Sequence, residues 1–316
     1  MGSYLLRRLG LAAITILGVS FLTFSSVRLI PGDVVDVLSS GSGVTHVEGK
    51  EALRRQLGLD RPLPVQYVAW MSKIVRGDFG RSLISNDSVA ANIWSRMPVS
   101  LELGIIATCF GFLIGVPIGI ISAMRQDTWL DYALRSVSVG MLAIPGYWIA
   151  TLVIVYGALW FGWTPPIIYI PFKEDPWGNI RQFLLPAALL GITGSASLMR
   201  LTRTTMLEVL RQDYVRTAWS KGLSERVVVL RHALRNALIP VVTLMGLSLA
   251  TIAGGTVIFE QIFNLPGMGR YLFLSVNQRD YPAVQGVVLV FAAIVVLANL
   301  LTDIAYGILD PRIRYQ

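Results

Sequence analysis

The 316-residue chain has few side chains that could do metal, thiol or phosphate chemistry. His46, His232 and Cys109 are its only histidines and cysteine, and it has no H-E-x-x-H pattern, so the sequence offers no metal site and no internal disulfide. The nearest approach to a phosphate-binding loop is Gly49-Lys50, but Val44 stands where the first glycine belongs. We therefore expect no catalytic residue in this chain.

Cations are the exception, and they concentrate in Asp213–Pro240, which reads DYVRTAWSKGLSERVVVLRHALRNALIP. We predict a first short helix over Asp213–Lys221, a turn with positive φ at Gly222, and a second helix with Ser224 as its N-cap. The second helix continues into an apolar segment, so a push on this hairpin would reach a membrane helix. The residues that we expect along its apolar stripe are Leu223, Val227, Leu230, Leu234 and Leu238.

Three roles fit such a hairpin. It could be an interfacial helix whose arginines lie among lipid headgroups, a nucleic-acid site, or a docking element that carries force between a cytosolic protein and the membrane helices. Nothing else in the sequence supports a nucleic-acid partner. Composition alone leaves the other two roles open.

The elements that must position the hairpin are membrane helices. Apolar residues make up 54% of the chain, charged residues 15%, and the mean hydropathy is +0.61, which is typical of an integral membrane protein. Windows of about twenty apolar residues predict six spans. These are Leu9–Ile30, Val99–Met124, Tyr132–Phe161, Phe183–Leu201, Leu238–Phe259 and Ala283–Leu309. The first resembles a signal peptide in its order of basic and apolar residues, but it lacks a cleavage site, so we expect a retained anchor.

The basic residues of the short loops predict the orientation. Arg7, Arg8 and the cations of the hairpin place both termini and the hairpin in the cytoplasm, so the net charge of +8 reflects topology. We expect the first span and an external helical loop over 1–97, a transmembrane domain over 98–309 with a cytoplasmic loop at about 202–237, and a cytoplasmic tail over 310–316. In the external loop, Glu51–Leu59 and Val65–Gly77 have helical spacing. They fit either a cap on the spans or a docking surface for a soluble partner.

Two features inside the spans stay open to interpretation. Gly111, Gly115 and Gly119 share one helix face, which suits close packing within the bundle or between subunits. Glu102, Glu260 and Asp303 lie in or near apolar helices. Such residues line pathways or pair with other chains more often than they face lipid, but the two glutamates are close to the outer ends of spans, where snorkelling toward the interface is an equal alternative. No substrate-binding residue can be assigned from the sequence.

The hairpin resembles the cytoplasmic EAA loop of ABC importer permeases, in the form typical of the dipeptide/oligopeptide/nickel branch. That branch has a pattern similar to D-Y-[VI]-R-T-A-x-x-K-G-L followed by R-H-x-L-x-N-A-L-x-P, which matches Asp213–Leu223 and Arg231–Pro240. The E-A-A positions are held by Arg216-Thr217-Ala218, so the glutamate of the general motif is absent, and Arg235 replaces its downstream proline. The resemblance covers nearly the whole chain, through Pro31–Asp33, Gly77–Ser82, Arg96–Pro98, Phe259-Glu260, Pro266–Gly269, Arg279–Pro282 and Asp310–Arg312.

The resemblance implies an all-α polytopic membrane protein with six transmembrane helices. Its fold would be the type I ABC importer transmembrane domain, with a long periplasmic or extracellular loop after the first helix, in a bacterial or archaeal cytoplasmic membrane. The implied role is that of a non-catalytic permease subunit that binds no cofactor itself. The implied partners are a second homologous permease subunit, two cytosolic ABC ATPases that use ATP and Mg, an extracytoplasmic solute-binding protein and membrane lipid.

The same resemblance assigns contacts with the ATPase to the first half of the hairpin. Tyr214, Ala218 and Trp219 would provide apolar seating, and Gly222 the turn. The full set of expected coupling residues is Asp213, Tyr214, Arg216, Thr217, Ala218, Trp219, Lys221, Gly222, Leu223 and Arg226.

A self-sufficient secondary transporter is the alternative function. Such a carrier is expected to have discontinuous helices in two corresponding halves and charged pairs near the midplane. An intramembrane enzyme is a third possibility that no catalytic constellation supports. Copurification with a P-loop ATPase separates the first two. The cargo stays open among peptides, nickel chelates, glutathione, opines and oligosaccharides.

Overall fold

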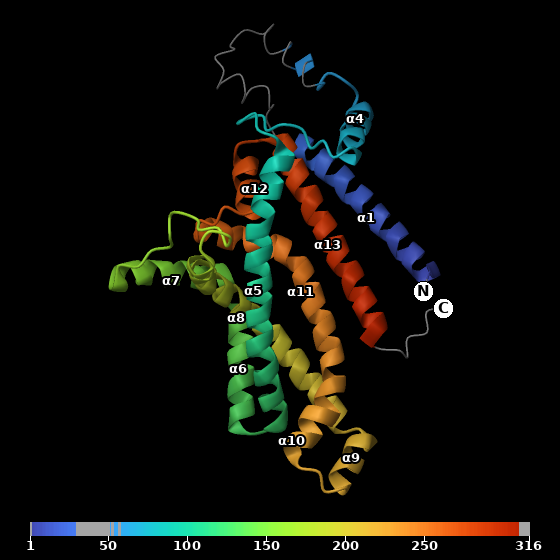
Figure 1. Ribbon diagram of the computed structural model, residues 1–316, viewed down its shortest axis with the longest axis vertical. Coiled ribbons are helices and arrows are strands. Elements are labelled where there is room, and N and C mark those ends of the chain that lie inside the picture. The colour runs from blue at the N-terminus through green and yellow to red at the C-terminus, as the bar shows by residue number, and fades with distance from the viewer. Residues whose placement is uncertain (1, 30–50, 52–53, 56–57, 310–316) are drawn as a thin grey trace. The chain divides into compact units, whose positions relative to one another are not determined.

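The computed structural model describes residues 2–29, 51, 54–55 and 58–309 (Figure 1). Within these ranges the chain is almost wholly helical, and five helices are long and apolar enough to cross a membrane. Four of them lie in α1 (Gly2–Leu29), α5 (Val89–Met124), α8 (Pro176–Leu210) and α13 (Tyr281–Leu309), and the fifth, Glu225–Ser248, runs through two short helical segments into α11 (Leu234–Ile262). A bent helix pair makes a sixth span if it is counted as one. The predicted all-α polytopic fold is confirmed.

The predicted third span over Tyr132–Phe161 is a bent pair of helices. Helix α6 (Trp129–Ala143) and helix α7 (Gly146–Phe161) meet at an angle of 88°. The break has a local cause, because Pro145 has no backbone N–H to continue the helical hydrogen bonds and its ring forces the preceding residue out of the helical region. Ile144 is accordingly extended, with φ −97° and ψ 124°.

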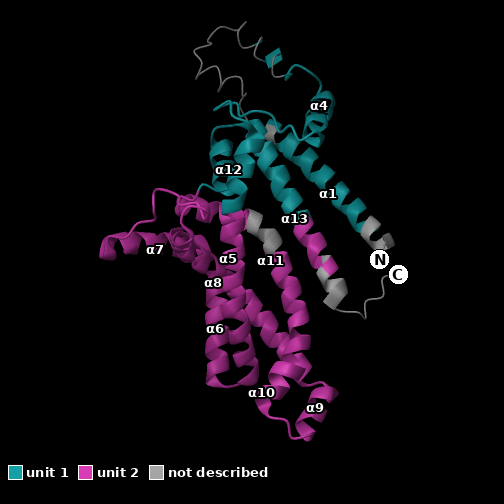
Figure 2. Cartoon of the chain, viewed as in Figure 1, with its two compact units in different colours: residues 1–99, 266–296 teal, residues 100–265, 297–316 magenta. Residues whose placement is uncertain are grey.

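The chain forms two compact units (Figure 2). The first comprises residues 1–99 and 266–296. It contains α1, α4 (Leu63–Val75), α12 (Met268–Asn277), the start of α5 up to residue 99 and the first half of α13 up to residue 296. Its core includes Val89 and Ile93 of α5, Met268 of α12, and Ala283 and Val287 of α13.

Helix α4 overlaps the predicted helix Val65–Gly77 but begins and ends two residues earlier, whereas residues 52, 53, 56 and 57 of the predicted helix Glu51–Leu59 fall outside the described residues. After α4, two of the segments that carry the family resemblance meet. The side chain of Ser82 donates a hydrogen bond to Asp280 Oδ2 at 2.5 Å, and the Leu83 backbone N–H donates to Asp280 Oδ1 at 3.1 Å. Asp280 is buried, so this hydrogen-bonded carboxylate fixes the loop before α5 to the start of α13.

The second unit comprises residues 100–265 and 297–316. It contains most of α5, the bent pair α6–α7, α8, α11 and the charged hairpin. The hairpin consists of α9 (Asp213–Ser220), α10 (Glu225–Val227) and a π-helical turn, η1 (Val228–Ala233), that leads into α11.

Packing between α5 and α8 is set by the three glycines predicted to share one face of α5. A Cβ atom at Gly115 would lie 2.6 Å from the carbonyl oxygen of Ser195, and one at Gly119 would lie 2.7 Å from that of Met199. At Gly111 the nearest atom would be the Gly191 carbonyl oxygen at 3.2 Å. The glycines therefore allow the two backbones of this chain to approach closely, and the structure selects packing within the bundle over a subunit interface.

Candidate functional site

The turn of the charged hairpin depends on Gly222. Its φ is +75°, in the left-handed region where only glycine is free of a steric penalty. Backbone hydrogen bonds from Lys221 N–H to the Thr217 carbonyl and from Gly222 N–H to the Trp219 carbonyl close the end of α9. Ser224 is at the predicted N-cap position of α10, but its side chain makes no capping hydrogen bond.

Two sets of contacts fasten α9 to the elements that follow it. Val215 and Ala218 of α9 are buried against Val228 in a small apolar core. On the same helix, the hydroxyl of Tyr214 accepts a hydrogen bond from Asn236 Nδ2 at 2.7 Å and donates to the His232 carbonyl oxygen at 3.3 Å. The hairpin is thus held to the base of α11 by apolar packing and by hydrogen bonds.

The expected apolar stripe of the second helix is wrong in its first half, whereas Leu234 and Leu238 are partly buried and pack against buried clusters as expected. Leu223, Val227 and Leu230 are exposed, whereas the buried face is formed by Val228, Val229, Ala233 and Ala237. The cause is η1, because a π-helical turn contains one residue more than an α-helical turn and rotates the residues on either side of it relative to each other. Small Ala233 and Ala237 then face the packed ends of the bundle, in a cluster with Ala123 of α5 and Met206 of α8.

The exposed surface of the hairpin combines aromatic, aliphatic and cationic side chains. Trp219 is 43% exposed and Tyr214 is equally so, and Leu223 and Leu230 extend this apolar surface. Arg216, Lys221, Arg226, Thr217 and Asp213 are also exposed. The Arg216–Asp213 ion pair, at 3.6 Å, is too solvated to contribute much stability. Of the expected coupling residues, Ala218 alone is buried inside the hairpin, where it positions α9.

Sequence reasoning missed an ion pair near the base of the hairpin. Asp131 in the first turn of α6 is fully buried, and it accepts hydrogen bonds from Arg203 Nε at 2.8 Å and from Arg203 Nη2 at 2.7 Å. Ser122 of α5 donates to the same carboxylate at 2.5 Å, and the Asp127 backbone N–H donates at 3.1 Å. This bidentate pair joins α5, α6 and α8. The sequence signal that could have pointed to Asp131 is its position three residues after Thr128, the N-cap of α6.

For Glu260 the structure decides against snorkelling. Its side chain is fully buried and accepts a hydrogen bond from the Ser100 hydroxyl at 2.7 Å. Ser100 satisfies the glutamate inside the unit, so the side chain has no need to reach the interface. Glu102 is half-buried, and the side chain of Asp303 lies outside the described residues.

Comparison with known proteins gives the family. The family "Binding-protein-dependent transport system inner membrane component" matches residues 115–315, and the N-terminal family of the same transport systems matches residues 1–104. The di/tripeptide transport system permease protein DppB of Pseudomonas aeruginosa is 39% identical over 336 residues. The dipeptide transport system permease protein DppB of Escherichia coli K12 is 36% identical over 339 residues. In both comparisons all of this chain and all of the relative are covered.

Solved structures agree on the fold. A methionine ABC transporter, MetNI, in an inward-facing conformation superposes with a TM-score of 0.57 at 16% identity, covering 69% of this chain and 96% of that chain. Sequence identity this low supports the fold alone, whereas the family matches extend over almost the entire sequence. The chain therefore belongs to the binding-protein-dependent transport system inner membrane components, the permease subunits of ABC importers.

Proposed function

We propose that this chain forms half of the translocation pathway for peptides or similar small solutes in an ATP-driven importer. A second homologous permease subunit supplies the other half, and an extracytoplasmic solute-binding protein delivers the cargo. Two cytosolic ATPases bind ATP and Mg, and one of them binds the charged hairpin in a groove on its surface. Both termini are cytoplasmic. The names of the relatives, which are di- and tripeptide permeases, support the class of cargo.

The observation that carries the proposal is the hairpin's exposed aromatic and cationic surface on a firmly anchored helix. Aromatic and arginine side chains are enriched in protein interfaces, where a few of them contribute most of the binding energy. Trp219 is the largest such side chain on α9, and Arg216 and Lys221 flank it in the sequence. Val215, Ala218 and the Tyr214 hydroxyl are meanwhile engaged with the base of α11.

This arrangement can transmit a displacement. When the nucleotide-bound ATPases close, the groove that holds α9 moves and α9 moves with it. The buried contact of Val215 with Val228 and the hydrogen bond between Tyr214 and Asn236 carry the displacement into α11. A short helix fused to a spanning helix, with different contacts in two states, is sufficient for such coupling.

A small cavity in the second unit supplies a candidate segment of the pathway. It has a volume of about 190 Å³ and lies between α5, α8 and α11. Its described wall contains no charged residue and includes Gly104, Thr108, Thr193, Ser248 and Gly255. Small and hydroxyl-bearing side chains suit a polar peptide backbone that must pass without being held tightly.

The test is to coexpress the chain with its ATPases and binding protein and to compare Trp219→Ala with Trp177→Ala. Trp177 is also exposed but is at the other end of α8. Loss of a central interface tryptophan typically costs about 2 kcal/mol or more, so Trp219→Ala should lower ATPase copurification about thirtyfold and reduce solute-stimulated ATP hydrolysis. Trp177→Ala should preserve both.

Wild-type ATPase binding and stimulation in Trp219→Ala would contradict the docking role. If the purified chain alone transported solute into liposomes when only an ion gradient drove the transport, the secondary-transporter alternative would replace the proposal.

A further inference from the structure

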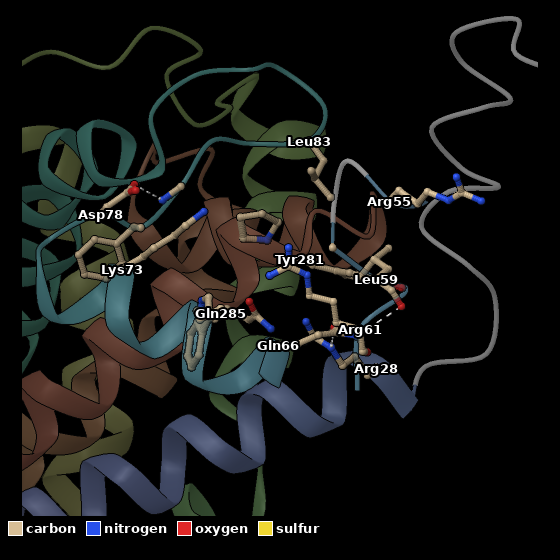
Figure 3. Close-up of a pocket in the computed structure, with 16 residues that line it drawn as sticks. Arg28, Arg55, Leu59, Arg61, Gln66, Lys73, Asp78, Leu83, Tyr281 and Gln285 are labelled. Carbon is tan, nitrogen blue, oxygen red and sulfur yellow. Dashed lines mark hydrogen bonds between the residues drawn. The ribbon is translucent and has the colours of Figure 1, made fainter. Parts of the chain in front are cut away.

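A cavity in the first unit, lined by several cationic side chains, is unrelated to the hairpin. It has a volume of about 430 Å³ and lies between the end of α1, helix α4, the loop that follows α4, and the first turn of α13 (Figure 3). Four cationic side chains line it, Arg28, Arg55, Arg61 and Lys73, against one carboxylate, Asp78. The described wall of the cavity therefore has an excess of positive charge.

Arg28 is held in place as a preformed donor. Its Nε donates to Gln66 Oε1 at 3.0 Å, and its Nη1 donates to the Phe24 carbonyl oxygen at 3.2 Å. Its guanidinium carbon lies 3.5 Å from the centre of the Phe24 ring. These contacts use two of the five N–H donors of the guanidinium, and the described residues contain no carboxylate paired with it.

Gln285 adds an independent sign that a ligand belongs in the cavity. It is one turn into α13, is only 4% exposed, and its Nε2 atom has no hydrogen-bond partner among the described residues. Figure 3 shows its amide directed into the cavity that Arg28 and Tyr281 also line. A buried amide donor without an acceptor is costly, and a bound oxyanion would satisfy it.

The position of the cavity indicates where that oxyanion comes from. Arg28 is two residues beyond the apolar window Arg7–Ser26, and Tyr281 begins the apolar window Tyr281–Thr302. The cavity is thus at the ends of two candidate spans, at the level where lipid headgroups lie. Helix α4 has no buried residue, and it exposes the apolar side chains of Val65 and Val68, as an interfacial helix does.

We propose that this cavity binds the phosphate of an anionic phospholipid. Arg28, Lys73 and Arg61 supply the positive charge, and Gln285 donates to a phosphate oxygen. Helix α4 would then lie along the headgroups. The bound lipid would connect it to α1 and α13, in addition to the direct contacts that α4 makes with α1. The Tyr67 hydroxyl hydrogen bond to Ser20 of α1, at 2.8 Å, is one of those contacts.

The experiment measures retention of phosphatidylglycerol by native mass spectrometry of the full chain purified in detergent, with phosphatidylcholine as the neutral comparison. The variants are Arg28→Gln, Lys73→Gln and Gln285→Glu. The last of these places a carboxylate beside the phosphate. Arg76→Gln, just past the end of α4 and outside the cavity wall, is the matched control. A hydrogen bond to a charged group is worth about 1.5–3 kcal/mol, so each cavity variant should retain phosphatidylglycerol at least tenfold less well, whereas Arg76→Gln should match wild type.

Equal retention in all four variants would overturn the proposal. Displacement of phosphatidylglycerol by inorganic phosphate at equal concentration would overturn the lipid source in favour of a free anion. Loss of binding to the solute-binding protein in the same variants, with lipid retention unchanged, would assign the cavity to a protein carboxylate instead. Lys73 is exposed, so Lys73→Gln keeps the test informative even if Arg28→Gln fails to fold.

Discussion

The conformation of Gly222 gives the sharpest test of how the hairpin works. A Cβ atom at this residue would meet no other atom within 4 Å, so a substitution is penalised only through its φ of +75°. The left-handed region costs an ordinary L-residue about 1–2 kcal/mol, with a β-branched side chain at the upper end, whereas asparagine adopts it readily. That free energy corresponds to a factor of about 5–30 in the ratio of chains with the native turn to chains in which the turn is distorted.

We therefore expect Gly222→Val to lower solute-stimulated ATP hydrolysis of the reconstituted transporter by about 5–30-fold, and Gly222→Asn to lower it by less than about twofold. Gly140→Val is the control, since Gly140 is an exposed helical residue of α6 whose Cβ would also meet nothing within 4 Å. Wild-type stimulation in Gly222→Val would refute the reasoning. Equal losses in the valine and asparagine variants would show that bulk against the ATPase matters and that φ does not.

Three further predictions concern stability, each measured by unfolding of the full chain in detergent. Gly115→Ala forces a Cβ to 2.6 Å from a backbone oxygen and should cost about 1–3 kcal/mol, whereas Gly140→Ala, with open space around it, should be neutral or stabilising; similar shifts in both would contradict the packing argument. Asp131→Asn removes the charge that compensates Arg203, which is only 16% exposed, and should cost about 3–5 kcal/mol; wild-type stability would show that the pair is dispensable. Burial raises the pKa of Tyr271 from 10.0 to about 12. The stability that the neutral phenol contributes is therefore present below pH 10 and is lost as the pH rises through 12. Tyr271→Phe should lessen this alkaline loss of stability. An unchanged alkaline limb in that variant would exclude ionisation of Tyr271 as a cause.

Much of this architecture could be predicted because its causes are local. Apolar windows are long enough to identify spans, and a glycine after a short charged helix identifies a turn with positive φ. The glycine face of α5 could be recognised from its spacing, but its partner could not. That partner, α8, is about eighty residues away in the sequence, and nothing within α5 selects it over a second subunit.

The errors arose where tertiary packing decides the outcome. The register of the apolar stripe depends on η1, which inserts an extra residue into one turn and has no sequence signature of its own. The sequence also left the environment of Glu260 open, because the Ser100 hydroxyl that donates to it is 160 residues away in the chain. The ion pair of Asp131 could not be recognised for the same reason, because its partner Arg203 is 72 residues away in the chain.

The π-helical turn also explains why Tyr214 matters more than its place in the family motif indicates. A π-turn is a weak point in a helix, so a displacement of α9 could be absorbed there and never reach α11. The Tyr214 hydroxyl bonds to His232 inside η1 and to Asn236 beyond it, and so bridges the junction from outside. Tyr214→Phe keeps the aromatic ring for the ATPase but loses this bridge. We expect it to preserve ATPase copurification while lowering solute-stimulated hydrolysis severalfold, and a matching loss of copurification would mean that the hydroxyl contacts the ATPase instead.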